Sequence, residues 1–162
     1  FQDKPFRSVT RGQSDLARFQ PEQDEAAGEA VEGSELATLT AYLKQTLGEA
    51  VKEVRSSDRL AESPVCLVAG EGDIDLNLER ILKAHGQVER ESARVLEVNP
   101  RHPVIRGLAG RLQGKGGDAG TEDICWLLLE EARLMEGELP REPAAFGGRL
   151  GRLMERALGR TE

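Results

Sequence analysis

Hydrophobic residues recur at helical spacing in some segments of the chain and gather into short apolar stretches in others. Leucines recur every three or four residues over 36–47, which predicts a helix that begins near Ser34, a residue type suited to cap the first free amides. Short apolar segments at 51–57, 64–69 and 94–99 predict three strands.

The remaining apolar segments predict helices. The segment 74–85 carries one apolar stripe and ends at a glycine, and Pro103 opens a helix over 103–112. Two further helices are expected over 122–136 and 143–158. The glycine-rich stretch 114–120 predicts a surface loop. The expected fold class is therefore α+β, with a small three-stranded sheet, flanking helices and a C-terminal helix pair.

The N-terminal part of the chain has a different composition. Residues 1–20 show no sustained period, and residues 21–33 combine acidic groups with glycine and almost no large apolar side chain. This pattern predicts a junction segment over 1–20, an acidic linker over 21–33 and the main domain over 34–162.

Composition and charge exclude several classes of protein. The chain has 162 residues and a formal net charge of −7, which argues against a nucleic-acid partner because such surfaces are basic. Its longest apolar runs, 65–69 and 124–129, are too short to cross a membrane. Cys66 and Cys125 lie within these runs and are expected to be small buried hydrophobic residues. Since the chain begins with Phe and shows no signal pattern, we expect a piece of a longer cytoplasmic protein.

Candidate catalytic chemistry is sparse. The Gly70–Asp75 turn lacks the third glycine of a dinucleotide fingerprint, and its carboxylates would repel a pyrophosphate. His85 and His102 lack the spacing of metal ligands. Acidic residues such as Glu130 are expected to lie on the solvent-exposed faces of helices. We therefore expect no catalytic, cofactor-binding or metal-binding residue and no enzymatic activity. The alternative is a small acidic ligand-binding or enzymatic domain that uses the Gly70–Asp75 turn.

Apolar surfaces are more informative than polar ones. The 122–136 helix is apolar on more of its circumference than one core contact needs, and the 143–158 helix has a single stripe. Two copies of this pair would form a four-helix bundle across a two-fold axis, unless the pair packs wholly within its own domain. The expected dimer interface consists of Ile124, Leu127, Leu128, Ala132, Met135, Phe146, Leu150, Leu153 and Met154.

The 74–85 helix poses a similar choice. Glycines flank it on both sides, so its stripe either covers the sheet or is offered to a partner. The residues concerned are Ile74, Leu78, Ile81 and Leu82.

Several segments carry a family resemblance. They are FRSVTRG (6–12), SSDRLAESPVCLVAGEGD (56–73), LERILKAHGQ (78–87), LEVNPRHPVI (96–105) and WLLLEEARLMEGELPREPAAFGGRL (126–150). Together they resemble bacterial members of the 90-kilodalton heat-shock chaperone family, and the resemblance covers essentially the whole chain.

The resemblance implies a specific position and role. The chain is similar to the C-terminal dimerisation domain of a cytoplasmic, ATP-dependent stress-response chaperone, with residues 1–20 at the end of the middle domain. ATP and Mg²⁺ would bind a missing N-terminal domain, leaving this chain without cofactor. Expected partners are a second copy through the last two helices and unfolded client proteins through Ile74, Leu78, Ile81 and Leu82. Gly147, Gly148 and Gly151 depart from the family pattern, which usually has larger residues there.

Overall fold

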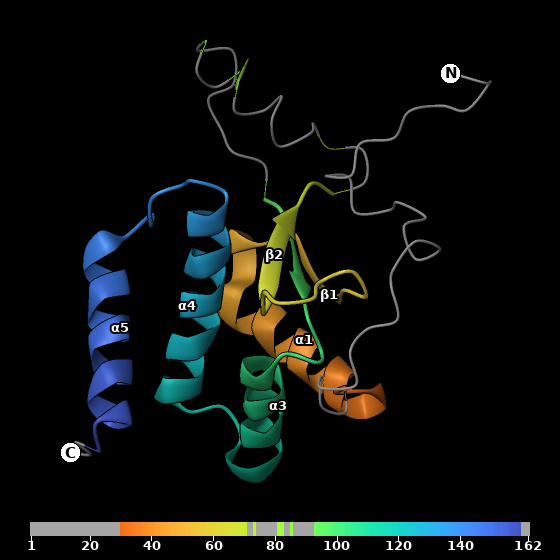
Figure 1. Cartoon of the computed structure of the whole chain (residues 1–162), viewed down its shortest axis with the longest axis vertical. Coiled ribbons are helices and arrows are strands. Elements are labelled where there is room, and N and C mark those ends of the chain that lie inside the picture. The colour runs from red at the N-terminus through yellow and green to blue at the C-terminus, as the bar shows by residue number, and fades with distance from the viewer. Residues whose placement is uncertain (1–29, 71–72, 74–80, 83–84, 86–92, 160–162) are drawn as a thin grey trace.

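The computed structural model describes residues 30–70, 73, 81–82, 85 and 93–159 (Figure 1). The strands are β1 (Glu53–Ser56), β2 (Val65–Val68) and β3 (Val95–Val98), and the helices are α1 (Gly33–Leu47), the 3₁₀ turn η3 (Gly48–Ala50), α3 (Pro103–Lys115), α4 (Ala119–Met135) and α5 (Pro143–Ala157). Within these residues the expected α+β class with a three-stranded sheet is confirmed.

The central strand of the sheet is β3, which pairs in parallel with β1 and antiparallel with β2. Leu96 on β3 lies opposite Val54 on one side and Leu67 on the other. Since side chains alternate along a strand, these three share one face of the sheet, while Glu97 belongs to the opposite face.

The hydrophobic core lies between this face of the sheet and the helices. Leu39 and Leu43 of α1 and Leu129 of α4 are all 0% exposed, as is Leu96 of the sheet. The spacing of Leu39 and Leu43 along the chain is part of the helical pattern that predicts α1. Each fully buried leucine contributes about 1.5–3 kcal/mol of transfer free energy. In Figure 1, α5 lies on the outer side of α4, away from the sheet.

Two predicted boundaries differ from the structure. Helix α1 begins at Gly33, with Glu32 at its N-cap, so Ser34 lies inside the first turn rather than before it. The predicted loop over 114–120 is wrong at both ends, because α3 continues to Lys115 and α4 begins at Ala119.

Asp118 explains the early start of α4. Its Oδ1 accepts hydrogen bonds from the backbone N–H and the hydroxyl of Thr121, each at 2.7 Å. This is the capping arrangement that satisfies free amides at a helix start. The expectation that Pro103 opens the preceding helix is confirmed, and His102 caps it by accepting the Val104 N–H at 3.2 Å.

Parts of the predicted organisation lie outside the described residues. The segments 1–20 and most of 21–33 are among them, so the division of the chain near residue 33 stays a prediction. Of the predicted 74–85 helix, Ile81 and Leu82 are helical, and His85 donates its N–H to the Ile81 carbonyl at 3.2 Å.

Candidate functional site: an apolar surface on α4 and α5

Helix α5 contains no buried residue, although it carries a continuous apolar stripe. The exposed fraction is 36% for Leu150, 38% for Leu153, 53% for Met154 and 78% for Leu158 just beyond the helix. A helix that only covered its own domain would bury this stripe. The stripe instead remains available to another molecule.

The orientation of α5 follows from the contacts of its arginines. Arg152 donates two hydrogen bonds to the carboxylate of Asp123 on α4, at 2.8 and 2.7 Å. The Arg149 guanidinium lies over the ring of Trp126 on α4, 5.1 Å from its centroid. Hydrogen bonding from Arg152 also lowers the pKa of Asp123. The polar side of α5 is thus docked on α4, which leaves the apolar side unburied.

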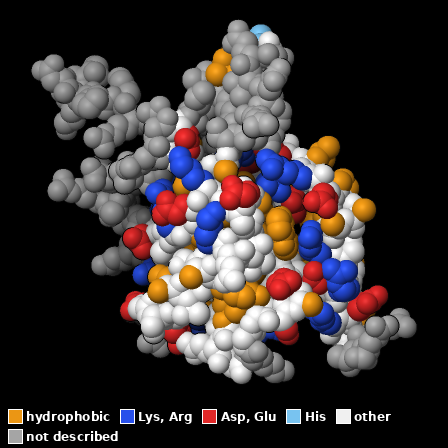
Figure 2. Space-filling model, turned by 180° about the vertical axis from the view of Figure 1, so that it is seen from behind, with side chains coloured by type: hydrophobic (Ala, Val, Ile, Leu, Met, Phe, Trp, Pro, Cys, Tyr) orange, Lys and Arg blue, Asp and Glu red, His pale blue; other side chains and the backbone are white. Residues whose placement is uncertain are grey.

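Exposed hydrophobic residues also lie at the end of α4 and in the connection between the two helices. The exposed fraction is 44% for Leu134, 74% for Met135 and 83% for Leu139. Figure 2, which views the molecule from behind so that α5 lies on the right, shows hydrophobic and charged side chains close together along that edge. We call the set Leu134, Met135, Leu139, Leu150, Leu153, Met154 and Leu158 the outer apolar surface.

The structure narrows the set of residues expected at a dimer interface. Leu128 and Ala132 are 3% and 2% exposed and belong to the core of this chain, so they do not face outward. The half-buried members are Ile124, Leu127 and Phe146, and the exposed members are Met135, Leu150, Leu153 and Met154.

Glu130 departs from its expected place on a solvated helix face. It is 4% exposed, and its Oε1 accepts a hydrogen bond from Arg133, which is also 4% exposed, at 2.6 Å. Its other carboxylate oxygen, Oε2, is buried with no hydrogen-bond partner. The sequence signal for this pair was the spacing of three residues, which places both groups on neighbouring turns of one helix.

The residues expected to contact client protein are only partly described. Ile81 is exposed, with 54% of its surface accessible, and Leu82 is half-buried. Ile74 and Leu78 lie outside the described residues.

A charged cluster on the opposite face of the sheet was missed by the sequence analysis. Glu97 is 3% exposed and accepts hydrogen bonds from Arg55 at 2.8 and 3.1 Å, from Arg59 at 2.9 Å and from Ser57 at 3.0 Å. Burial raises the pKa of Glu97, but the hydrogen bonds outweigh it and hold that pKa below its usual value. A lone acidic residue between Leu96 and Val98 was the available signal.

The two cysteines behave largely as expected. Cys125 is 0% exposed and Cys66 is half-buried, and both are free thiols. Burial raises the pKa of Cys66 to about 11 and that of Cys125 to about 12, so both are protonated at neutral pH.

Of the Gly70–Asp75 turn, the structure describes Gly70 and Asp73, which contact each other. The Asp73 N–H donates to the Gly70 carbonyl at 3.1 Å, and the Asp73 carboxylate pairs with Lys52 at 2.7 Å. A Cβ atom at Gly70 would lie 2.5 Å from the Asp73 carboxylate. This ion pair fills the space beside Gly70, whereas residues 71–72 and 74–75 of the turn to which the alternative assigned a ligand lie outside the described residues.

The described part of the chain offers neither a metal-binding cluster nor a membrane-spanning helix. No group of three or more His, Cys, Asp or Glu residues there could hold a metal ion. None of the helices described is long and apolar enough to cross a membrane.

Comparison with known proteins places the chain in a family. Residues 1–162 match the sequence profile of the family described as Hsp90 protein. Proteins named chaperone protein HtpG are similar to it. The one from Paramagnetospirillum magneticum is 50% identical over 161 residues, and the one from Roseobacter denitrificans is 48% identical over 161 residues, each match covering 98% of this chain. The chain spans about a quarter of the length of these relatives, 26% in both cases.

These matches correct the expected position of the chain within the family. The family profile and the relatives match the whole chain and identify the Hsp90 family, not a C-terminal dimerisation domain. The assignment to such a domain is therefore corrected to membership of the family. The expectations that the chain is not an enzyme and holds no cofactor, which rested on its sparse catalytic motifs as well as on that assignment, are corrected by the same matches. ATP and Mg²⁺ are therefore no longer assigned to a missing N-terminal domain.

Proposed function

Because the chain belongs to the Hsp90 family, we propose that it acts in a cytoplasmic molecular chaperone, where it joins two copies of the protein and contacts unfolded client protein. The observation that carries the proposal is the orientation of α5. Its arginines are engaged with α4, and its leucines and Met154 are left exposed.

A second copy is the occupant that best fits the outer apolar surface. The surface covers one side of α5 and includes the end of α4, and a two-fold axis beside α5 would bring the same residues of two copies together. Four helices would then enclose Leu150, Leu153 and Met154 as a bundle. Burial of each such side chain contributes about 1.5–3 kcal/mol, which favours association at micromolar concentration.

Sedimentation velocity of the 162-residue chain tests self-association. We expect a dimer at micromolar concentration, and we expect Leu153→Asp to dissociate it because the charge would be buried between the copies. The matched control is Val104→Asp, which also replaces an exposed hydrophobic residue, 45% accessible, but on α3. A monomeric wild-type chain, or a Leu153→Asp variant that remains a dimer, would contradict the proposal.

Client contact is proposed for the described part of the 74–85 segment. Ile81 presents an isoleucine side chain to solvent at a helical position, where an unfolded chain with exposed apolar residues would bury it. We expect Ile81→Asp to weaken the suppression of aggregation of a heat-denatured enzyme, measured by light scattering, while the sedimentation coefficient stays that of wild type. Full suppression by this variant would argue against a client role for Ile81.

A further inference from the structure

The exposed side of α3 is basic. Between residues 101 and 115 the sequence contains no acidic residue, although the chain as a whole carries a formal net charge of −7. The basic residues of this stretch are Arg101, Arg106, Arg111 and Lys115. The three arginines are exposed, and we call them the basic face of α3. Arg111 is paired with Asp118 at 3.2 Å, whereas the other two require a separate account.

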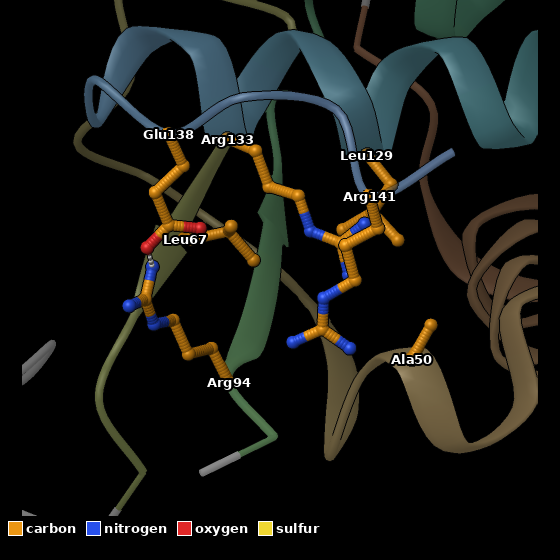
Figure 3. A pocket seen from close by; sticks show the side chains of 7 residues that line it. All are labelled: Ala50, Leu67, Arg94, Leu129, Arg133, Glu138 and Arg141. Carbon is orange, nitrogen blue, oxygen red and sulfur yellow. Dashed lines mark ion pairs between the residues drawn. The ribbon is translucent and has the colours of Figure 1, made fainter. Parts of the chain in front are cut away.

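Most arginines elsewhere in the described part of the chain form ion pairs with carboxylates. Figure 3 shows one such pair beside the small pocket at the end of α4, between Arg94 and Glu138 at 2.6 Å. Among the described residues, Arg101 and Arg106 form no ion pair, either with the neighbouring α1 or with any other element. Two exposed guanidinium groups on or next to α3 are therefore left for an acidic partner.

The chain reaches α3 at a fixed point. Val31 is 5% exposed, and its N–H donates to the carbonyl of Pro100 at 3.0 Å. Since Pro100 is followed directly by Arg101, this hydrogen bond places residue 31 beside the start of the basic face. The residues immediately before Val31 are therefore confined to its neighbourhood.

The segment that precedes this anchor carries the opposite charge. Residues 21–29 lie outside the described residues, and their sequence contains no basic residue. Their acidic residues are Glu22, Asp24, Glu25 and Glu29. An extended segment of this length spans up to about 30 Å. The 13-residue helix α3 is about 20 Å long, so the segment can reach along the whole of it.

We propose that the segment 21–29 docks along α3, with its carboxylates against Arg101 and Arg106. Exposed ion pairs are individually weak. The anchor at Val31 makes the docking intramolecular, with an effective concentration in the millimolar range, so that several weak pairs together hold the segment. The acidic segment thereby shields the basic face from other acidic chains. The docking is independent of the outer apolar surface and of self-association.

The amide NMR signals of Gly107 and Gly110, which are exposed on α3, test the proposal. The full chain is compared with the triple variant Glu22→Gln, Asp24→Asn and Glu25→Gln, at about 0.05 M and about 0.5 M salt. We expect the two sets of signals to differ at low salt and to coincide at high salt, because screening removes the ion pairs. Identical signals at low salt overturn the proposal.

A second triple variant is the matched control. Glu131→Gln, Glu142→Gln and Glu155→Gln also remove three negative charges, at exposed positions on or next to α4 and α5. We expect these substitutions to leave the signals of Gly107 and Gly110 in place. A shift equal to that of the first triple variant would show that net charge alone moves the signals, and it would overturn the proposal.

Proteolysis reports on the segment itself. A protease that cleaves after glutamate should cut after Glu25 slowly while the segment is docked, since cleavage follows the population of the undocked form. Arg106→Gln removes one exposed ion pair, and we expect it to speed this cleavage about twofold to fivefold. Arg141→Gln, an exposed change beyond α4, should leave the rate unchanged. Equal rates in wild type and Arg106→Gln contradict docking.

Dilution separates the chain's own segment from that of a second copy. Intramolecular docking does not depend on protein concentration, so the NMR difference and the cleavage rate should be unchanged on about tenfold dilution. Effects that fade on dilution would assign the bound segment to a second copy, and they would overturn docking within one chain.

Discussion

Arg152 of α5 and Asp123 of α4 are joined by two parallel hydrogen bonds, with nitrogen–oxygen distances of 2.8 and 2.7 Å. Asp123 is largely buried, with 13% of its side chain accessible, whereas half of the Arg152 side chain, 52%, faces solvent. The pair fixes the rotation of α5 about its own axis, because a two-point contact allows less freedom than a single one. It therefore determines which side of α5 faces away from the domain.

Replacing Asp123 with Asn should loosen α5 without unfolding the domain. The amide keeps one acceptor for Arg152 but loses the charge, so the helix remains formed and detaches more often from α4. We expect faster hydrogen exchange at the amides of α5 and unchanged exchange at those of α1. Glu131→Gln, an exposed change on the same helix, is the control. Equal protection of α5 in wild type and Asp123→Asn would refute this role.

Replacing Glu97 with Gln should destabilise the sheet. The variant leaves Arg55 and Arg59 without their shared carboxylate, and since both arginines are partly accessible to water, we expect a loss of about 2–3 kcal/mol in the free energy of unfolding. Urea denaturation measures this loss. Glu53→Gln, on the exposed edge of β1, should change the stability by less than about 0.5 kcal/mol. A Glu97→Gln variant as stable as wild type would show that the charge of Glu97 contributes nothing to the free energy of unfolding.

Asp118 should make stability depend on acid pH. Hydrogen bonds from the Thr121 hydroxyl and N–H lower the pKa of Asp118 to about 2 from its ordinary 3.8. A carboxyl whose pKa is lower in the folded state stabilises the protein above its unfolded pKa, and this contribution is lost as pH falls through the folded value. We expect wild type to lose more stability than Asp118→Asn between about pH 4 and pH 2, because Asn keeps an acceptor oxygen but does not titrate. Acid unfolding is followed by circular dichroism. Curves of the same shape for wild type and Asp118→Asn would disprove the role of Asp118 in the pH dependence.

Replacing Gly147 with Ala should have opposite effects on the single chain and on its self-association. A Cβ atom at Gly147 meets nothing within 4 Å in this chain, so the variant should gain about 0.8–1 kcal/mol of helix stability. If the second copy approaches α5 closely at this glycine, the added methyl group should weaken the dimer. Urea denaturation in the Leu153→Asp background measures the first effect, and sedimentation in the wild-type background measures the second.

Gly107→Ala on α3 provides the comparison, since a Cβ atom there also meets nothing within 4 Å. We expect this variant to gain helix stability and to leave the dissociation constant of the dimer unchanged. A dimer weakened equally by both substitutions would show that Gly147 has no particular place at the interface.

The sequence predicted the elements of the fold well, because each has a clear period. The leucines of α1 are buried at the predicted spacing, and the three strands lie where short apolar segments indicated. The loop over 114–120 failed because glycine content was given more weight than the capping pattern of Asp118 and Thr121. A side-chain cap can start a helix inside a stretch whose composition favours a turn.

The candidate surface was predicted less well, since periodicity shows that a helix has two sides but not which side meets its neighbour. The apolar stripe of α5 was recognised, yet its polar side is the one that contacts α4. The apolar pattern of α4 does not separate Leu128 and Ala132 from Met135, although the first two lie in the core of this chain and Met135 is exposed. An acidic residue on a helix predicts a solvent-exposed position, because acidic residues are rarely buried without a partner. The pairing of Glu130 with Arg133, which explains its burial, does not follow from composition.

Docking α5 by arginines rather than by leucines gives the two sides of this helix opposite responses to salt. Added salt screens the contact between Arg152 and Asp123, so α5 is held less firmly to its own α4. Sulfate and similar salts strengthen apolar association in the same solution, so Leu150, Leu153 and Met154 are driven harder toward a partner. The ionic composition of the surroundings thus sets the balance between a helix that belongs to its own domain and one that is shared with another molecule.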